Sequence, residues 1–311
     1  MPDTRPDTHP DESPVEPQDA DAPPIHGPRT FSWQVEGQAV EVTIDVAGKG
    51  EPVLLLPSLG PASTRAQMWP LARQLQDDFE TFTVDWPGFG AGPHPRFAWQ
   101  PAHYRAFLVD LCAELFDGPI RVAAAGHAST YALQVAAEHP ATWSRIAMIA
   151  PTWRCPLSTT LGTHRWLWAG LRRFVGLPGI GETLYRLTVA APVLNRLYQT
   201  HLFGDATKVT PRLIEEKGRV CRQPNARYAA TAFITGALDP VPNATDYEEL
   251  IGRQLVPILA VCGLETPPRP WREMAILLKR PEVTVNRIPG ALAPHEEHPA
   301  PVSRMLEEFF T

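Results

Sequence analysis

The chain has 311 residues, of which 44% are hydrophobic and 20% charged, and its formal net charge is −6 at pH 7. This composition is typical of a globular protein, and no stretch approaches the roughly 20 uninterrupted apolar residues that a membrane span needs. The four cysteines lack the CxxC spacing of zinc sites, and the start of the chain lacks the pattern of a secretion signal. We therefore expect a cytoplasmic protein without membrane insertion, metal or other cofactor.

The first 28 residues differ in composition from the rest of the chain. They contain eight prolines and seven acidic residues against one arginine, which accounts for the whole net charge. Such a segment buries too little apolar surface to offset its ordering entropy, so we expect residues 1–28 to be disordered. Residues 29–311 hold 27 basic and 27 acidic side chains. A neutral body of this kind offers no electrostatic footprint for nucleic acid.

From residue 29 onward, the apolar pattern predicts alternating strands and helices. Polar and apolar residues alternate around Glu36-Gly37-Gln38, which is typical of an antiparallel hairpin. Continuous apolar runs then predict buried strands at 52–57, 79–85, 120–126 and 143–151. Helical spacing predicts helices between them, at 68–78, 101–116 and 131–140. Strands and helices that alternate with short links imply right-handed crossovers and a parallel sheet.

The alternation stops after Pro151. Residues 152–252 are rich in Trp, Leu and Arg and predict several helices, one of which begins at Thr210-Pro211 with a capping residue followed by proline. Strands are expected again at 255–263 and 282–290, and helices at 270–280 and 299–310. The chain thus divides into an α/β core, formed by residues 29–151 and 253–311, and a helical insertion at 152–252 that we expect to cover the core as a lid.

Four stretches resemble the α/β-hydrolase fold superfamily, and they occur in the order and spacing of that family. They are LLLPSLG at 54–60, VDWPGFGAG at 84–92, AAGHASTYAL at 124–133 and IPGALAPHEEHP at 288–299. In the family, these stretches form the oxyanion loop, the D-x-P-G-x-G turn, the nucleophile elbow and the segment with the catalytic histidine. The resemblance covers residues 30–311 and implies a mostly parallel central sheet with flanking helices and a helical lid.

The residues at the family's catalytic positions depart from its pattern. With Gly126 as the first glycine of G-x-S-x-G, the nucleophile position falls on Ala128. The acid position after the penultimate strand is Thr266, with Glu265 one residue earlier, and the base position is Ala293. A methyl group cannot attack a carbonyl. The resemblance therefore implies a hydrolase fold that lacks the Ser-His-Asp triad, as a pseudoenzyme does.

The backbone of the oxyanion site is expected to survive these changes. The amides of Leu59 and Ser129 are the expected donors, because two N–H groups at a helix N-terminus bind a carbonyl oxygen or an anion. Ser58 on the oxyanion loop and His127 beside the elbow are the polar side chains expected at this ligand site. The favoured hypothesis is a pocket for a small apolar or carbonyl-containing molecule, used either for binding or for lyase- or isomerase-like chemistry.

Two other functions remain open at this stage. In the first, His295 activates a water molecule and Glu265 orients its ring, which gives an atypical ester or thioester hydrolase. In the second, the protein is an interaction module that recruits a partner through the acidic tail. A zinc site at His295 and His298 is disfavoured, because these residues lie near the start of the last helix and suit a structural role.

Overall fold

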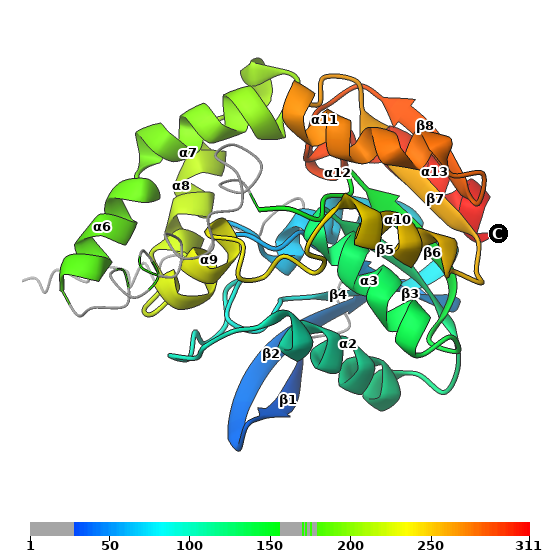
Figure 1. Cartoon of the computed structure of the whole chain (residues 1–311), viewed down its shortest axis with the longest axis horizontal. Helices are drawn as coiled ribbons and strands as arrows, with labels where there is room; N and C mark the ends of the chain where they lie inside the picture. Colours follow the sequence, from blue (N-terminus) through cyan, green and yellow to red (C-terminus); the bar gives the residue numbers. More distant parts are fainter. Residues whose placement is uncertain (1–27, 156–169, 171, 173–174, 176–178) are drawn as a thin grey trace, which may run out of the picture.

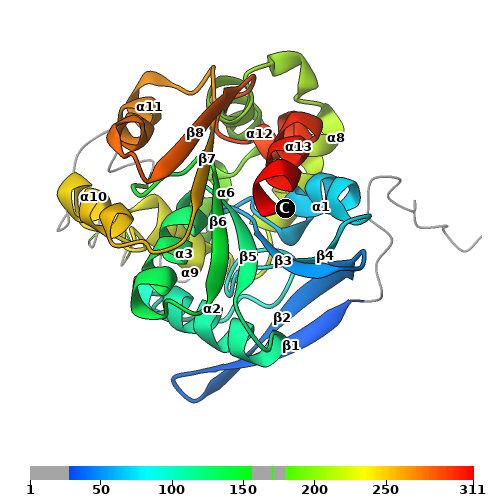
Figure 2. The same ribbon diagram turned by 90° about the vertical axis from the view of Figure 1, so that its right-hand side faces the viewer.

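The structure is a computed structural model in which residues 28–155, 170, 172, 175 and 179–311 are described. Apart from Pro28, the acidic tail lies outside these residues. The described chain surrounds one eight-stranded sheet with helices on both faces (Figures 1 and 2). None of the described helices combines the length and the apolar character needed to cross a bilayer.

The sheet has the strand order β1-β2-β4-β3-β5-β6-β7-β8. β1 (Arg29–Val35) and β2 (Gln38–Ala47) form the expected antiparallel hairpin, and β2 also pairs antiparallel with β4 (Phe79–Val84). All pairs from β4 onward are parallel and involve β3 (Glu51–Leu56), β5 (Ile120–Ala125), β6 (Trp143–Ile149), β7 (Ile258–Gly263) and β8 (Val283–Ile288). The mostly parallel sheet that the sequence predicts is therefore confirmed.

Two apolar layers cover the two faces of the sheet. Neighbouring residues of β3, such as Leu54 and Leu55, are both fully buried but belong to different layers. One layer contains α2 (Pro101–Leu115) and α3 (His127–Glu138), and the other contains α1 (Trp69–Leu75) and α13 (Pro299–Phe310). Because successive strand side chains point to opposite faces, a strand between two layers must be apolar throughout, as the sequence shows.

The chain between β6 and β7 is helical where it is described. Its elements are α6 (Ile180–Thr188), α7 (Ala191–Leu197), η2 (Tyr198–Leu202), η3 (Ala206–Lys208), α8 (Pro211–Cys221), α9 (Arg227–Ile234) and α10 (Ala244–Gly252). Thr210 caps α8 as expected, since its hydroxyl accepts a hydrogen bond from Leu213 N at 3.2 Å. Helices α6 and α7 lie at the left of Figure 1, away from the strands.

Shorter helices follow β7 and β8. After β7 come α11 (Pro268–Met274) and η4 (Ala275–Lys279), and after β8 comes α12 (Pro294–Glu297). Ala293, at the start of α12, belongs to the same apolar cluster as Tyr198 and Phe203 of the insertion. The insertion is therefore packed directly against the segment that carries the base position.

One arginine is paired with two buried carboxylates beside the sheet. Arg65, in η1 (Arg65–Met68), donates from Nε to Asp45 at 2.7 Å and from a guanidinium nitrogen to Asp85 at 2.9 Å. Burial raises the pKa of Asp85, and the attraction of Arg65 opposes that rise. Gly90 adopts a φ of 79°, and a Cβ there would lie 2.3 Å from the carboxyl of Asp85. Asp85 thus fixes the turn after β4, as expected from the sequence.

We expect Arg65→Met to lower the free energy of unfolding by about 3–5 kcal/mol, because it leaves two buried carboxylates without a counter-charge. Urea denaturation at pH 7 measures this loss. Arg253→Met is the matched control, since the Arg253–Glu249 pair is 68% and 58% exposed and should contribute less than about 1 kcal/mol. Equal, small losses in both variants would contradict the role given to Arg65.

Candidate active site at the carboxyl ends of the parallel strands

The turn between β5 and α3 is centred on Gly126. This residue has a φ of 53° and a ψ of −126°, a conformation that residues with a side chain rarely adopt. Its N–H donates to Ile149 O at 2.9 Å, and its carbonyl accepts from Thr152 N at 3.2 Å. A Cβ at this position would lie 3.1 Å from Ser58 Cβ and 3.6 Å from Thr152 Oγ1. The apex of the turn therefore carries no side chain and borders two hydroxyl-bearing residues.

The structure corrects the expected position of Ala128. The apex lies two residues earlier, and Ala128 is fully buried in the first turn of α3. Helix α3 begins at His127, four residues before the predicted start, because the small residues after the apex are already helical. The small residues Ala124 and Ala128 take the places of the two glycines of G-x-S-x-G, and Gly126 takes the place of the serine.

Ser129 does not face the site, contrary to expectation. It is fully buried, its hydroxyl donates to Ala124 O at 2.6 Å, and its N–H donates to Gly126 O at 3.2 Å. The amide that follows the apex is that of His127, and the first N–H groups of a helix have no partner within the helix. The candidate donor pair for a ligand oxygen thus becomes Leu59 and His127.

Three polar side chains meet beside the apex. His127 Nδ1 lies 2.8 Å from Thr152 Oγ1, and His127 Nε2 lies 3.6 Å from Asp239 Oδ1. The histidine is 3% exposed and packs edge-on against Phe233, with ring centroids 4.9 Å apart. His127 is one of the residues expected at the site from the sequence, whereas Thr152 was not predicted. Asp239 was not predicted either, because its contact with His127 depends on how the insertion returns to the core.

The residues expected at or beside the acid and base positions make hydrogen bonds that connect loops. Thr266 Oγ1 donates to Gly263 O at 2.8 Å, and Glu265 accepts from Gly290 N at 2.6 Å. Ala293 is 4% exposed, and its N–H donates to Leu202 O in the insertion at 2.9 Å. These contacts connect the end of β7 with the segment after β8, and that segment with the insertion.

His295 is not paired with Glu265. The histidine is 1% exposed, and neither ring nitrogen has a hydrogen-bond partner among the described residues. Burial lowers its pKa to about 4, against the attraction of Glu296. Glu296 is itself occupied by Lys217 and by Gln67 Nε2, the latter at 3.0 Å. The relay of Glu265, His295 and water that the sequence left open is therefore not assembled.

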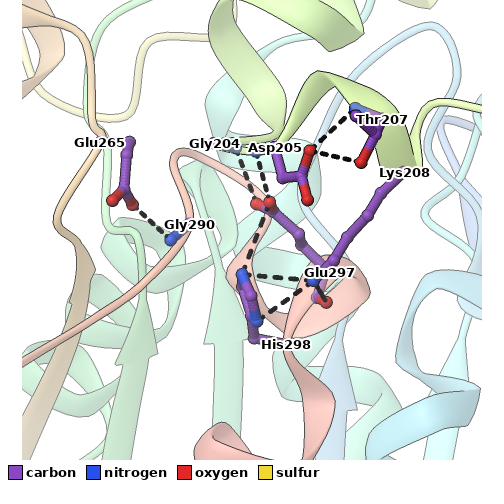
Figure 3. Close-up of polar contacts among 8 residues, drawn as sticks. All are labelled: Gly204, Asp205, Thr207, Lys208, Glu265, Gly290, Glu297 and His298. Atoms are coloured by element: carbon purple, nitrogen blue, oxygen red, sulfur yellow. Dashed lines mark hydrogen bonds and ion pairs between the residues drawn. The ribbon is translucent and has the colours of Figure 1, made fainter.

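Glu297 and His298 belong to a structural contact between α12 and the insertion (Figure 3). The buried Glu297 carboxylate accepts from Gly204 N at 2.8 Å and Asp205 N at 2.7 Å, and Lys208 Nζ donates to Glu297 O at 2.9 Å. Within the part of the chain that the structure describes, no group of three His, Cys, Asp or Glu residues is placed to hold a metal ion.

His295 should make stability depend on pH. Its pKa is about 4 in the folded state and 6.5 in the unfolded state, so the folded state favours the neutral ring. The contribution of the neutral His295 ring to the free energy of unfolding is complete above pH 6.5. It is lost as the pH falls toward 4, by about 3 kcal/mol in total. His295→Leu should flatten this part of the profile in urea denaturation at several pH values. His139→Leu, at an exposed position, should leave the wild-type slope. A wild-type slope in His295→Leu would contradict the assignment.

Comparisons with known proteins agree with this architecture. A family model described as the alpha/beta hydrolase family matches residues 53–305. No functionally curated protein matches the sequence significantly. Similar solved structures include a thermophilic esterase from Thermogutta terrifontis (18% identity, 91% of this chain and 97% of that one, TM-score 0.68). The Cif epoxide hydrolase from Acinetobacter nosocomialis is also similar (17%, 92% and 90%, TM-score 0.71). So is the enol-lactonase from Burkholderia xenovorans (13%, 87% and 96%, TM-score 0.66).

Together with the sheet order and the left-handed turn at Gly126, the family match shows that this chain belongs to the alpha/beta hydrolase family.

Proposed function

We propose that the protein binds a small molecule with an ester, thioester or other carbonyl group beside Gly126, and that no side chain at the elbow apex acts as nucleophile. The observation that carries this proposal is the left-handed glycine at the carboxyl end of β5. In a serine hydrolase of this fold, the nucleophile stands at this turn. Here the position holds only a hydrogen atom, and the adjacent space borders Ser58 and Thr152.

The backbone amides of Leu59 and His127 supply polarity to this space. Amide donors of this kind contribute on the order of 3 kcal/mol each to the binding of a developing oxyanion. The same donors orient the carbonyl of a bound ligand without any change at the apex. Carbonyl compounds are therefore the ligand class that the remaining polar groups favour.

The helical insertion supports a covered pocket. Its segment 203–208 is tied to the core through Glu297, and Leu202 O accepts the N–H of Ala293. Both contacts lie on the segment that follows β8, which brings the insertion to the edge where parallel sheets of this type bind ligands. We propose that residues 152–252 act as a lid over this edge.

Two of the three similar solved structures, the esterase and the enol-lactonase, have names that imply carbonyl substrates. The third is an epoxide hydrolase. Esters and lactones share the carbonyl group that the Leu59 and His127 amides would bind. At identities below 20% this likeness extends to the fold, and the ligand class comes to this chain as a proposal.

Ser58→Phe should weaken ligand binding, because the aromatic ring would occupy the region beside Gly126 in which we propose that the ligand binds. Isothermal titration with aryl and alkyl methyl ketones, which cannot be hydrolysed, measures the affinity. For a ketone that binds the wild type, we expect a loss of at least about tenfold, equivalent to 1.4 kcal/mol.

Ser32→Phe is the matched control, since Ser32 lies on the exposed face of β1. It should bind ketones as the wild type does, and circular dichroism should show both variants folded. Unchanged affinity in Ser58→Phe, or no binding of any ketone by the wild type, would contradict the proposed function.

A further inference from the structure

We infer that Thr152 is the nucleophile of this site, with His127 as its base and Asp239 as the residue that positions the base. This rests on the proposed function, because it requires a carbonyl ligand beside Gly126. The three residues come from three segments: the loop after β6, the start of α3 and the loop between α9 and α10. Hydrolysis by these residues is the activity that would follow.

The contacts of His127 define the roles of its two nitrogens. Nε2 lies 3.6 Å from Asp239 Oδ1, beyond hydrogen-bond distance, and has no hydrogen-bond partner among the described residues. We assign the ring proton to this nitrogen, because a carboxylate beside it can only accept a hydrogen bond. Nδ1 is then unprotonated and accepts the hydroxyl proton of Thr152 at 2.8 Å. This arrangement of nucleophile, base and orienting carboxylate is the one that activates a hydroxyl.

The Thr152 hydroxyl lies next to the apex of the turn. Its Oγ1 is 3.6 Å from the place that a Cβ on Gly126 would take, which is van der Waals contact distance. Thr152 is partly exposed, whereas His127 is 3% exposed. Thr152 is thus the more exposed of the two residues, and its base is shielded from solvent.

The backbone fixes Thr152 in this position. Its N–H donates to Gly126 O at 3.2 Å, and its carbonyl accepts from Thr130 Oγ1 at 3.0 Å. Asp239 is fixed as well, since its Oδ1 accepts from Cys155 N at 2.8 Å. Positions held from several sides satisfy the preorganisation that a catalytic group requires.

Ester hydrolysis at this site proceeds in two steps, acylation of Thr152 and hydrolysis of the acyl-threonine. Thr152 Oγ1 attacks the carbonyl carbon while His127 Nδ1 takes the hydroxyl proton, and the Leu59 and His127 amides receive the developing oxyanion. The bond to the alcohol breaks, and His127 returns the proton to the departing oxygen. Water attacks the acyl-threonine by the same route, which releases the acid and restores the hydroxyl and the neutral imidazole. No oxidant, metal or further reactant is consumed.

Turnover of 4-nitrophenyl acetate and butyrate tests this inference. We expect Thr152→Ala and His127→Gln to lose about 10²–10⁴-fold in kcat, and Thr152→Ser to stay within about tenfold of the wild type. Asp239→Asn should lower kcat with an unchanged KM, because a positioning residue acts through His127 rather than on the substrate. Ketone affinity should persist in Thr152→Ala, which separates loss of chemistry from loss of binding.

Thr81→Ala is the matched control. Thr81 is fully buried in β4 and donates to Ala47 O at 3.1 Å, so this variant loses a buried threonine hydroxyl outside the site and should keep its kcat. Mass spectrometry after reaction with an alkyl fluorophosphonate should find the adduct on Thr152 of the wild type. Ser58 and Ser63 are the alternative targets, since their hydroxyl oxygens lie 3.1 Å apart beside the turn. An adduct on either serine, wild-type turnover in Thr152→Ala, or ketone binding without any ester turnover would overturn the inference while leaving the proposed function intact. Absence of ketone binding by the wild type would contradict both this inference and the proposed function.

Discussion

The left-handed turn at Gly126 is the constraint on which the rest of the site depends. β5 ends and α3 begins within one residue, which only an unusual backbone conformation allows. The peptide groups of the turn bind Ile149 O and Thr152 N, so the end of β6 is locked to the same point. As a consequence, the side chains of His127 and Thr152 are adjacent, although neither was recognisable as part of a pair.

The residues expected at or beside the acid and base positions of the family make structural contacts. Glu265 accepts an amide from the segment after β8, and Ala293 packs under the insertion and donates to Leu202 O. A histidine at position 293 would meet an apolar cluster instead of a solvent-filled pocket. In the proposed assignment, the chemistry of the site comes from groups around Gly126.

Much of the fold could be predicted from the sequence, because continuous apolar runs and helical spacing report burial directly. The apex was misplaced by two residues, because Gly126 can be aligned either with the first glycine of G-x-S-x-G or with its serine position. Only the positive φ of Gly126 shows that it stands at the serine position. The contact of His127 with Asp239 was out of reach, because it joins segments separated by the insertion. Thr152 had one usable signal, a hydroxyl directly after a parallel strand.

A crystal structure of the protein after reaction with an alkyl fluorophosphonate would show which residue beside the glycine turn reacts with an electrophile. We expect density continuous from Thr152 Oγ1 to phosphorus, with the phosphoryl oxygen facing the Leu59 and His127 amides. A phosphonate attached elsewhere, or an unmodified chain with the Gly126 edge closed by side chains, would contradict this account.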